Sequence, residues 1–203
     1  MAMFSKLEKF AFYKWLLPIG VAGAMLTGCS EYNEQSLPWP YVNRFDVNDQ
    51  GWRVNVIQPE VGSAPVHSKA GGNRDGYIYA FDQFTTFWYF IASQAFVTEA
   101  RKSYNRTLRF DLKQLATDAP LDGNDILLTN GIDTLRYNTN HHPGTTWTSY
   151  SVRMNELSGW KKGSSPATKA DIQTVLQNLT DLRIRGEYRT GADTCGLDNA
   201  MIY

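Results

Sequence analysis

Apolar and polar residues alternate along most of the chain from residue 51 onward. In the segment TLRFDLKQL (107–115), Leu108, Phe110 and Leu112 alternate with charged side chains, which is the pattern of a strand with one buried face. The same pattern predicts strands at 51–57, 76–82, 125–130, 133–139, 146–154, 181–188 and 197–203. Clusters of Gly, Asn and Asp separate these segments, as expected for an antiparallel sandwich or barrel.

Two segments depart from this alternation. Residues 85–92 (TTFWYFIA) are apolar on both faces, which predicts a central strand covered on each side. In residues 168–179, Ile172, Val175, Leu176 and Leu179 follow helical spacing, and Thr168 with Asp171 resembles a capping box. We therefore expect one short helix, of about three turns, packed by its apolar stripe against an otherwise all-β domain.

The first 28 residues have the layout of a secretory signal peptide. Lys6, Lys9 and Lys14 precede an uncharged run at 15–26. That run is shorter than the roughly 20 residues of a membrane-spanning helix, and it contains Pro18. We therefore expect it to be an export signal that is removed.

Cys29 follows this run directly. The residues LTGC at 26–29 resemble a bacterial lipobox, which implies that Cys29 becomes the acylated first residue of an envelope lipoprotein. Two or three acyl chains would hold the protein on a membrane almost permanently, since each buried methylene contributes about 0.8 kcal/mol. The alternative is ordinary export with a disulfide between Cys29 and Cys195, the only other cysteine. Both uses need the same sulfur, so each excludes the other.

Cleavage before Cys29 would leave 175 of the 203 residues, enough for one domain with a substantial core. Of 20 basic and 20 acidic side chains, 17 and 19 would remain, a net charge of −2. This balance does not indicate a nucleic-acid partner, which usually requires a clearly basic face. Residues 31–41 are polar with two prolines, so we predict a tether at 29–43 and a single domain at 44–203.

The order of the motifs resembles the laminin B domain, also called laminin domain IV. The resemblance covers residues 45–203 and rests on GGNRDGYIYAFD, FWYFIA, YNRTLRFDLKQ, DILLTNGIDTLRY and the final LRIRGEYRTGADTCGLDNAMI. It implies an antiparallel jelly-roll β-sandwich akin to carbohydrate-binding modules. Arg74, Asp75 and Cys195 depart from what the family commonly has at these positions. These departures bear on loop conformation more than on the fold.

The sequence offers few candidates for catalysis. Common enzyme signatures such as GxSxG, the P-loop and HExxH are absent. His141 and His142 precede Pro143 and Gly144 in a predicted turn, and we interpret them as solvated loop residues. We interpret Cys195 as a buried structural thiol. A hydrolase would need paired carboxylates in a cleft, whereas the acidic residues are scattered through turns.

A structural calcium site is a further hypothesis. Jelly-roll modules of the kind that the resemblance implies often hold an ion where the first and last strands meet. Asp46 and Asp198 are the candidate ligands here, with backbone oxygens from Gly71 and Gly72. The alternative is that both carboxylates accept hydrogen bonds at strand ends.

The aromatic residues give the best sequence argument for binding, because sugar rings stack on exposed aromatic planes. Trp52, Trp88 and Trp147 lie within predicted strands and are assigned to the core. The remaining surface candidates for ligand binding are Trp39, Tyr137, Asn138, Asn140 and Trp160.

Two function classes follow from these observations. The first is a non-catalytic lipoprotein module that binds glycans or matrix-like polymers at the outer membrane or cell surface. The second is a structural or protein-docking envelope lipoprotein without a sugar site. Aromatic side chains exposed across one sheet would favour the first class, and a polar sheet face or an aliphatic patch would favour the second.

Overall fold

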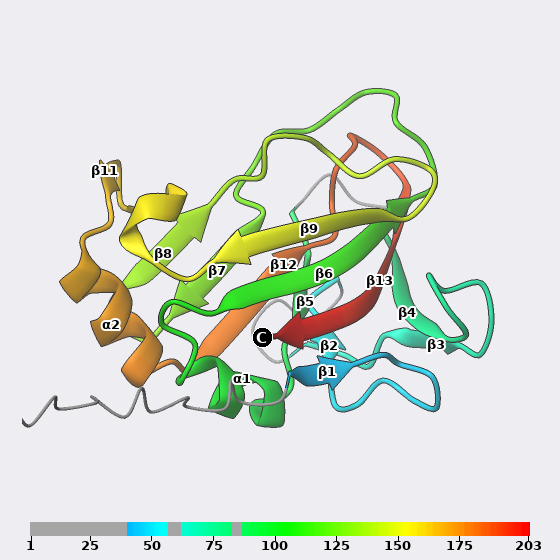
Figure 1. Ribbon diagram of the computed structural model, residues 1–203. Helices are drawn as coiled ribbons and strands as arrows, with labels where there is room; N and C mark the ends of the chain where they lie inside the picture. Colours follow the sequence, from blue (N-terminus) through cyan, green and yellow to red (C-terminus); the bar gives the residue numbers. More distant parts are fainter. Residues whose placement is uncertain (1–39, 57–61, 83–86) are drawn as a thin grey trace, which may run out of the picture. The chain divides into compact units, whose positions relative to one another are not determined.

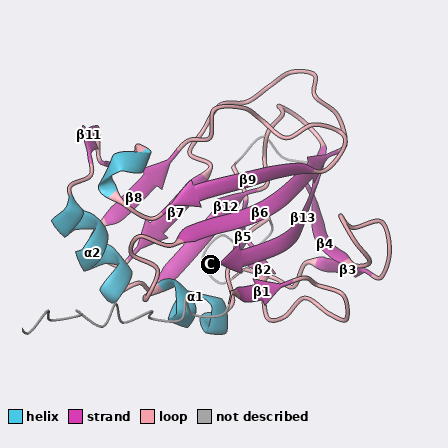
Figure 2. Cartoon of the chain, in the orientation of Figure 1, coloured by secondary structure: helices cyan, strands magenta, loops and turns pink. Residues whose placement is uncertain are grey.

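The computed structural model describes residues 40–56, 62–82 and 87–203. The chain divides into two compact units, residues 1–36 and 37–203, and every described residue belongs to the second unit. The signal peptide, Cys29 and Trp39 lie outside the described residues. Within the second unit, two antiparallel sheets face each other as the layers of a β-sandwich (Figure 1; Figure 2). The predicted jelly-roll fold class is confirmed.

The first sheet has its longest strand, β13 (Asp193–Ile202), near the middle. One edge of β13 pairs with β6 (Thr107–Gln114), which in turn pairs with β9 (Thr148–Arg153). The other edge pairs with β4 (Tyr77–Asp82) and, near the C-terminus, with β1 (Tyr41–Asn43). β3 (Val66–Ser68) completes the sheet beside β4. Sequence reasoning placed residues 41–43 in the tether; their pairing with β13 makes them part of the folded domain instead.

The second sheet forms the opposite layer. Its strand order is β11 (Ser165–Pro166), β10 (Lys161–Lys162), β8 (Thr134–Tyr137), β7 (Ile126–Thr129), β12 (Asp181–Arg185), β5 (Tyr89–Ile91) and β2 (Arg53–Val54). β5 lies between β12 and β2, with Tyr89 and Phe90 buried. This agrees with the prediction of a covered strand in 85–92, of which the structure describes residues 87–92.

The predicted helix is present as α2 (Lys169–Gln177), beside β7 and β8 (Figure 1). Its capping box is formed: the Asp171 backbone N–H donates to Thr168 Oγ1 at 3.2 Å, and the Thr168 backbone N–H donates to Asp171 Oδ2 at 3.0 Å. Ile172, Val175 and Leu176 are buried. These residues therefore belong to the core and do not line a binding groove.

The expectation of a single helix is wrong. A second helix, α1 (Gln94–Ala100), begins at the N-cap Ser93, whose hydroxyl accepts from the Phe96 backbone N–H. It has only seven residues, too few for a clear helical period in the sequence, and it forms because Phe96, Val97 and Ala100 are buried in the core. A 3₁₀ turn at Glu156–Ser158 follows β9. No helix in the described part of the chain is long and apolar enough to cross a membrane.

The core lies between the sheets and contains large aromatic side chains. Trp52 and Trp88 are 1% exposed, which confirms their assignment to the core. Trp88 packs where Gly186 has no side chain: a Cβ there would lie 2.1 Å from the indole. Because interiors are packed to crystal-like density, this contact leaves no room for a larger residue at 186.

Candidate functional site

Aromatic side chains gather on the outward face of the first sheet. Tyr77 and Tyr79 alternate along β4 with the buried Ile78 and Ala80, so both rings point away from the core. Trp147, just before β9, meets Tyr77 edge to face, with 5.3 Å between the ring centroids. The Tyr77 and Tyr79 centroids are 5.6 Å apart. We call these three half-buried residues, Tyr77, Tyr79 and Trp147, the aromatic platform.

The next two strands of the sheet support the platform. Gly196 of β13 pairs with Tyr79, and a Cβ there would lie 3.0 Å from the Tyr77 ring and 3.1 Å from Trp147. Glycine therefore allows both rings to lie directly on the sheet. Lys113 of β6 places its ammonium 4.8 Å from the Tyr77 centroid and 4.6 Å from that of Trp147. These distances are those of cation–π contacts.

The loop between β3 and β4 fixes the outer edge of the platform. The Gly71 carbonyl accepts hydrogen bonds from Trp147 Nε1 at 3.1 Å and from Lys113 Nζ at 3.3 Å. A hollow of about 320 Å³ opens beside the rings, bounded by Tyr77, Tyr79, Lys113 and Gly196. Polar groups next to flat rings are the combination that orients a ligand in a mostly apolar site.

Sequence reasoning missed the platform for an identifiable reason. Trp147 was assigned to the core, but it is half-buried on the outer face. The alternation in GYIYAFD shows that Tyr77, Tyr79 and Phe81 share a face, and Phe81 is 50% exposed. That signal was available, but the pattern does not show which of the two faces is outward.

The surface role predicted for Trp160 is contradicted by its burial. This side chain is 1% exposed, packs against Tyr137 with centroids 5.1 Å apart, and donates from Nε1 to the Arg153 carbonyl at 2.9 Å. Trp160 begins the turn toward β10, whose pairing with β8 brings it under the Tyr137 ring. It is therefore a core residue.

Three of the other predicted binding residues lie close together in the chain and only partly form a site. Tyr137 and Asn140 line a hollow of about 160 Å³ beside His141, at the side of β9. Asn138 is exposed.

The two adjacent histidines have different contacts. The His141 ring stacks on Tyr150, with centroids 5.0 Å apart, and His142 pairs with Asp122 at 3.1 Å. The hollow beside His141 has half the volume of the hollow at the platform, and the half-buried ring in its lining is that of Tyr137.

The calcium hypothesis can be tested against the oxygen atoms near Asp198. Asp198 is 1% exposed, and its two carboxylate oxygens accept the backbone N–H groups of Asn73 and Asn199, each at 2.6 Å. A Cβ built at Gly72 would lie within 2.7 Å of Asp198 Oδ2 and 2.4 Å of the Arg74 and Gly76 carbonyl oxygens, so oxygen atoms surround this position. Carboxylate and carbonyl oxygens suit Ca²⁺.

Burial, followed by the negative charges of Asp111 and Asp46, raises the pKa of Asp198 to about 7. A bound cation would relieve the repulsion between these carboxylates. The Gly71 carbonyl, which we expected to face the ion, instead binds Trp147 and Lys113. Among the described residues, no group of three acidic, His or Cys side chains could hold a metal. Calcium here would therefore depend on Asp198, Asp46 and backbone oxygens.

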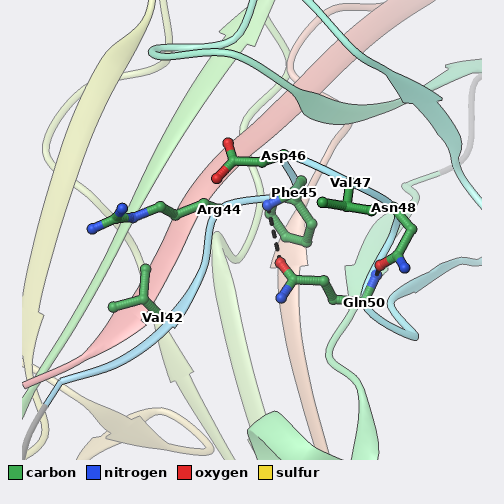
Figure 3. Close-up of a pocket in the computed structure, with 7 residues that line it drawn as sticks. All are labelled: Val42, Arg44, Phe45, Asp46, Val47, Asn48 and Gln50. Atoms are coloured by element: carbon green, nitrogen blue, oxygen red, sulfur yellow. Dashed lines mark hydrogen bonds between the residues drawn. The ribbon is translucent and has the colours of Figure 1, made fainter.

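A separate hollow of about 470 Å³ surrounds Asp46. Figure 3 shows that its lining comes from one stretch of chain, residues 42–50, in which the Phe45 backbone N–H donates to Gln50 Oε1 at 2.9 Å. Phe45 holds a left-handed φ of 57° while its ring is fully buried. The hollow is the inside of a bent loop, and the described residues that line it all belong to this one segment.

Cys195 is a fully buried free thiol on β13, as expected. Burial raises its pKa well above the usual value. Because the thiolate is the nucleophilic form, this environment makes Cys195 unreactive.

The fold is an all-β jelly roll with half-buried aromatic rings on the outward face of one sheet. Residues 89–202 match the family described as laminin B (domain IV). The match spans more than half of the 203 residues, so the chain belongs to the laminin B family.

Known proteins agree with this assignment. Laminin subunit gamma-1 of Danio rerio is 30% identical over 166 residues, which is 78% of this chain and 10% of the relative. The chain thus spans about one tenth of that protein. The L4b domain of human laminin alpha-2 superposes with a TM-score of 0.64 at 10% identity, over 80% of this chain and 96% of that domain. A family 11 carbohydrate-binding module from Clostridium thermocellum gives 0.46 at 13% identity, over 80% and 86%. That likeness is too loose to bear on the ligand.

Proposed function

We propose that this protein is a non-catalytic module of the cell envelope that binds glycans through the aromatic platform. The observation that supports this proposal is the set of outward rings on the first sheet, Tyr77, Tyr79 and Trp147, held in place by Gly196 and Lys113. Pyranose rings carry apolar C–H faces and polar edges, so they suit flat aromatic rings bordered by hydrogen-bonding groups.

The competing role is protein docking or structural support without a sugar site. That role would be favoured by a patch of exposed aliphatic side chains. Within the described ranges, the most exposed aliphatic side chains are Val47, Leu115, Ile132 and Leu157, each on a different segment of the chain. The platform therefore favours glycan binding.

Variants of the platform test the proposal. We expect Tyr79→Ala and Trp147→Ala to reduce binding on a glycan array about tenfold or more, because each removes a stacking ring worth about 1.4 kcal/mol or more. Tyr203→Ala is the matched control, since this terminal ring is 49% exposed and lies outside the platform. Absence of any glycan signal for the wild-type protein, at unchanged folding by circular dichroism, would reject the glycan role.

We further propose that the protein is exported and anchored by lipid on Cys29. The support is the LTGC motif after an apolar run, together with a Cys195 thiol that is free and buried. Intact-mass analysis of the native protein should give an acylated Cys29 as the first residue and an unmodified Cys195. A disulfide between these two residues would contradict the anchor.

A further inference from the structure

Beside the aromatic platform, the same sheet face holds a cluster of arginine residues. Arg44, Arg74 and Arg109 line a hollow of about 440 Å³ together with Asn73, Asn199 and Asp111. They come from the loop after β1, the loop between β3 and β4, and β6. In Figure 3 the Arg44 side chain extends away from the loop that carries Asn48 and Gln50. We call Arg44, Arg74 and Arg109 the arginine pocket.

Asp111, the acidic side chain among the described residues that line this hollow, already has partners of its own. Asp111 is 1% exposed and accepts hydrogen bonds from Ser149 Oγ at 2.5 Å, Asn73 Nδ2 at 2.8 Å and Asn199 Nδ2 at 2.9 Å. Asn199 reaches it from a β-bulge in β13, with a left-handed φ of 49° that asparagine tolerates. Asp111 therefore holds the two asparagine side chains in place.

The arginine side chains lack acceptors within the described residues. There, none of Arg44, Arg74 and Arg109 lies within 4.0 Å of a carboxylate oxygen in an ion pair. Arg109 Nε is buried and has no hydrogen-bond partner. A guanidinium carries five N–H donors in a planar fork that matches a carboxylate or a sulfate. The pocket thus offers several donors and positive charge to an acceptor from outside.

The arginine pocket and the aromatic platform lie on one continuous surface. Arg109, Asp111 and Lys113 alternate on the outward face of β6, and four residues of strand span about 13 Å. The loop between β3 and β4 joins the two sites: Gly71 contacts the platform, and Asn73 contacts the arginine pocket. One extended ligand lying along β6 could therefore occupy both.

We infer that the glycan bound by this protein is anionic, with a sugar ring on the aromatic platform and a carboxylate or sulfate ester of a neighbouring sugar in the arginine pocket. This inference rests on the proposed glycan-binding function and specifies its ligand class. Lys113 adds a cation at the platform itself. A neutral glycan would leave the guanidinium groups of the pocket without acceptors.

Matched polymers distinguish the charge from the sugar. Binding of the full chain is measured for polygalacturonate and its fully methyl-esterified form, and for dextran sulfate and dextran, in 20 and 500 mM NaCl. We expect about tenfold or tighter binding of at least one anionic member than of its neutral partner, and a loss of this preference at high salt, because salt screens exposed charges. The pair that shows the preference identifies carboxylate or sulfate as the ligand group.

Variants then assign the preference to the arginine pocket. Arg109→Gln and Arg74→Gln should each reduce binding of the preferred anionic polymer about tenfold while leaving binding of its neutral partner unchanged. Lys161→Gln, which removes an exposed charge from the second sheet, should change neither. Equal binding of charged and neutral partners would overturn the anionic ligand and leave the glycan function standing. Loss of binding of both partners in Tyr79→Ala supports the platform independently, and failure to bind any of the four polymers overturns the inference.

Discussion

At the scale of single residues, the sandwich contains a buried ion pair between Arg185 and Asp125. Arg185 is 0% exposed and lies 2.7 Å from Asp125 Oδ1, while its Nη1 donates to the Leu121 carbonyl at 3.0 Å. The Tyr188 ring centroid is 4.0 Å from the guanidinium carbon. Charges so far from water are tolerated only when paired and hydrogen-bonded.

We expect Asp125→Ala to lower the free energy of unfolding by about 3–5 kcal/mol, because it leaves the Arg185 charge buried without its partner. Asp118→Ala is the control: it breaks the surface pair with Arg189, in which Asp118 is 66% exposed, and should cost much less, because water screens an exposed pair. Urea denaturation measures both. Equal losses in the two variants would mean that the buried pair contributes no more than a surface pair.

At the scale of elements, the ends of three segments bring buried acidic side chains together. Asp82 ends β4, Asp193 begins β13, and Glu187 follows β12; none is more than 1% exposed. Burial, followed by the negative charges of Asp82 and Asp193, raises the pKa of Glu187 to about 8 from 4.5. Between about pH 4.5 and pH 8, Glu187 therefore keeps its proton in the folded protein, whereas the same side chain has lost it in the unfolded chain.

This proton predicts a loss of stability with rising pH. Between about pH 4.5 and 8 the folded state binds more protons than the unfolded state, so the Glu187 contribution falls by up to roughly 1.4 kcal/mol per pH unit. We expect Glu187→Gln to gain stability relative to wild type from pH 5 to pH 8, measured by urea denaturation. Asp118→Asn should show no such change, because Arg189 lowers the pKa of Asp118 and its titration lies below this range. A constant difference between wild type and Glu187→Gln would refute the predicted titration.

The sequence predicted the positions of individual strands and of α2 better than it predicted the binding surfaces. Period-two alternation located β4, β6, β9 and β12 to within a few residues, because one face of each strand is buried and the other is not. The capping box of Thr168 and Asp171 and the helical spacing of the apolar residues located α2, because both features lie within the helix itself. The seven residues of α1 gave no period, and their helix depends on packing against distant strands.

At the scale of the whole molecule, the binding surfaces depend on contacts that no local pattern contains. Trp147 meets Tyr77 across 70 positions of sequence, and Asn73 reaches Asp111 from the loop between β3 and β4. The alternation of GYIYAFD puts three rings on one face, but only the pairing of β13 with β4 on one side and with β6 on the other places that face beside Lys113. The sequence predicts a surface position for Trp160 because the pattern around it does not show that β10 pairs with β8, and this pairing buries its ring.

The calcium hypothesis belongs to the same scale, because Asp46 and Asp198 come from opposite ends of the domain. With the dissociation constant of about 10⁻⁴–10⁻³ M that is typical of extracellular modules, 10 mM Ca²⁺ should stabilise the folded protein by about 1.4–2.7 kcal/mol. Asp198→Asn should abolish the rise in Tm, because the amide keeps the shape of the side chain and removes its charge. Asp75→Asn, in the neighbouring loop, should retain the rise. An unchanged Tm of the wild-type protein in 10 mM Ca²⁺ would leave Asp198 with the alternative role, a carboxylate that holds the Asn73 and Asn199 backbone N–H groups in place.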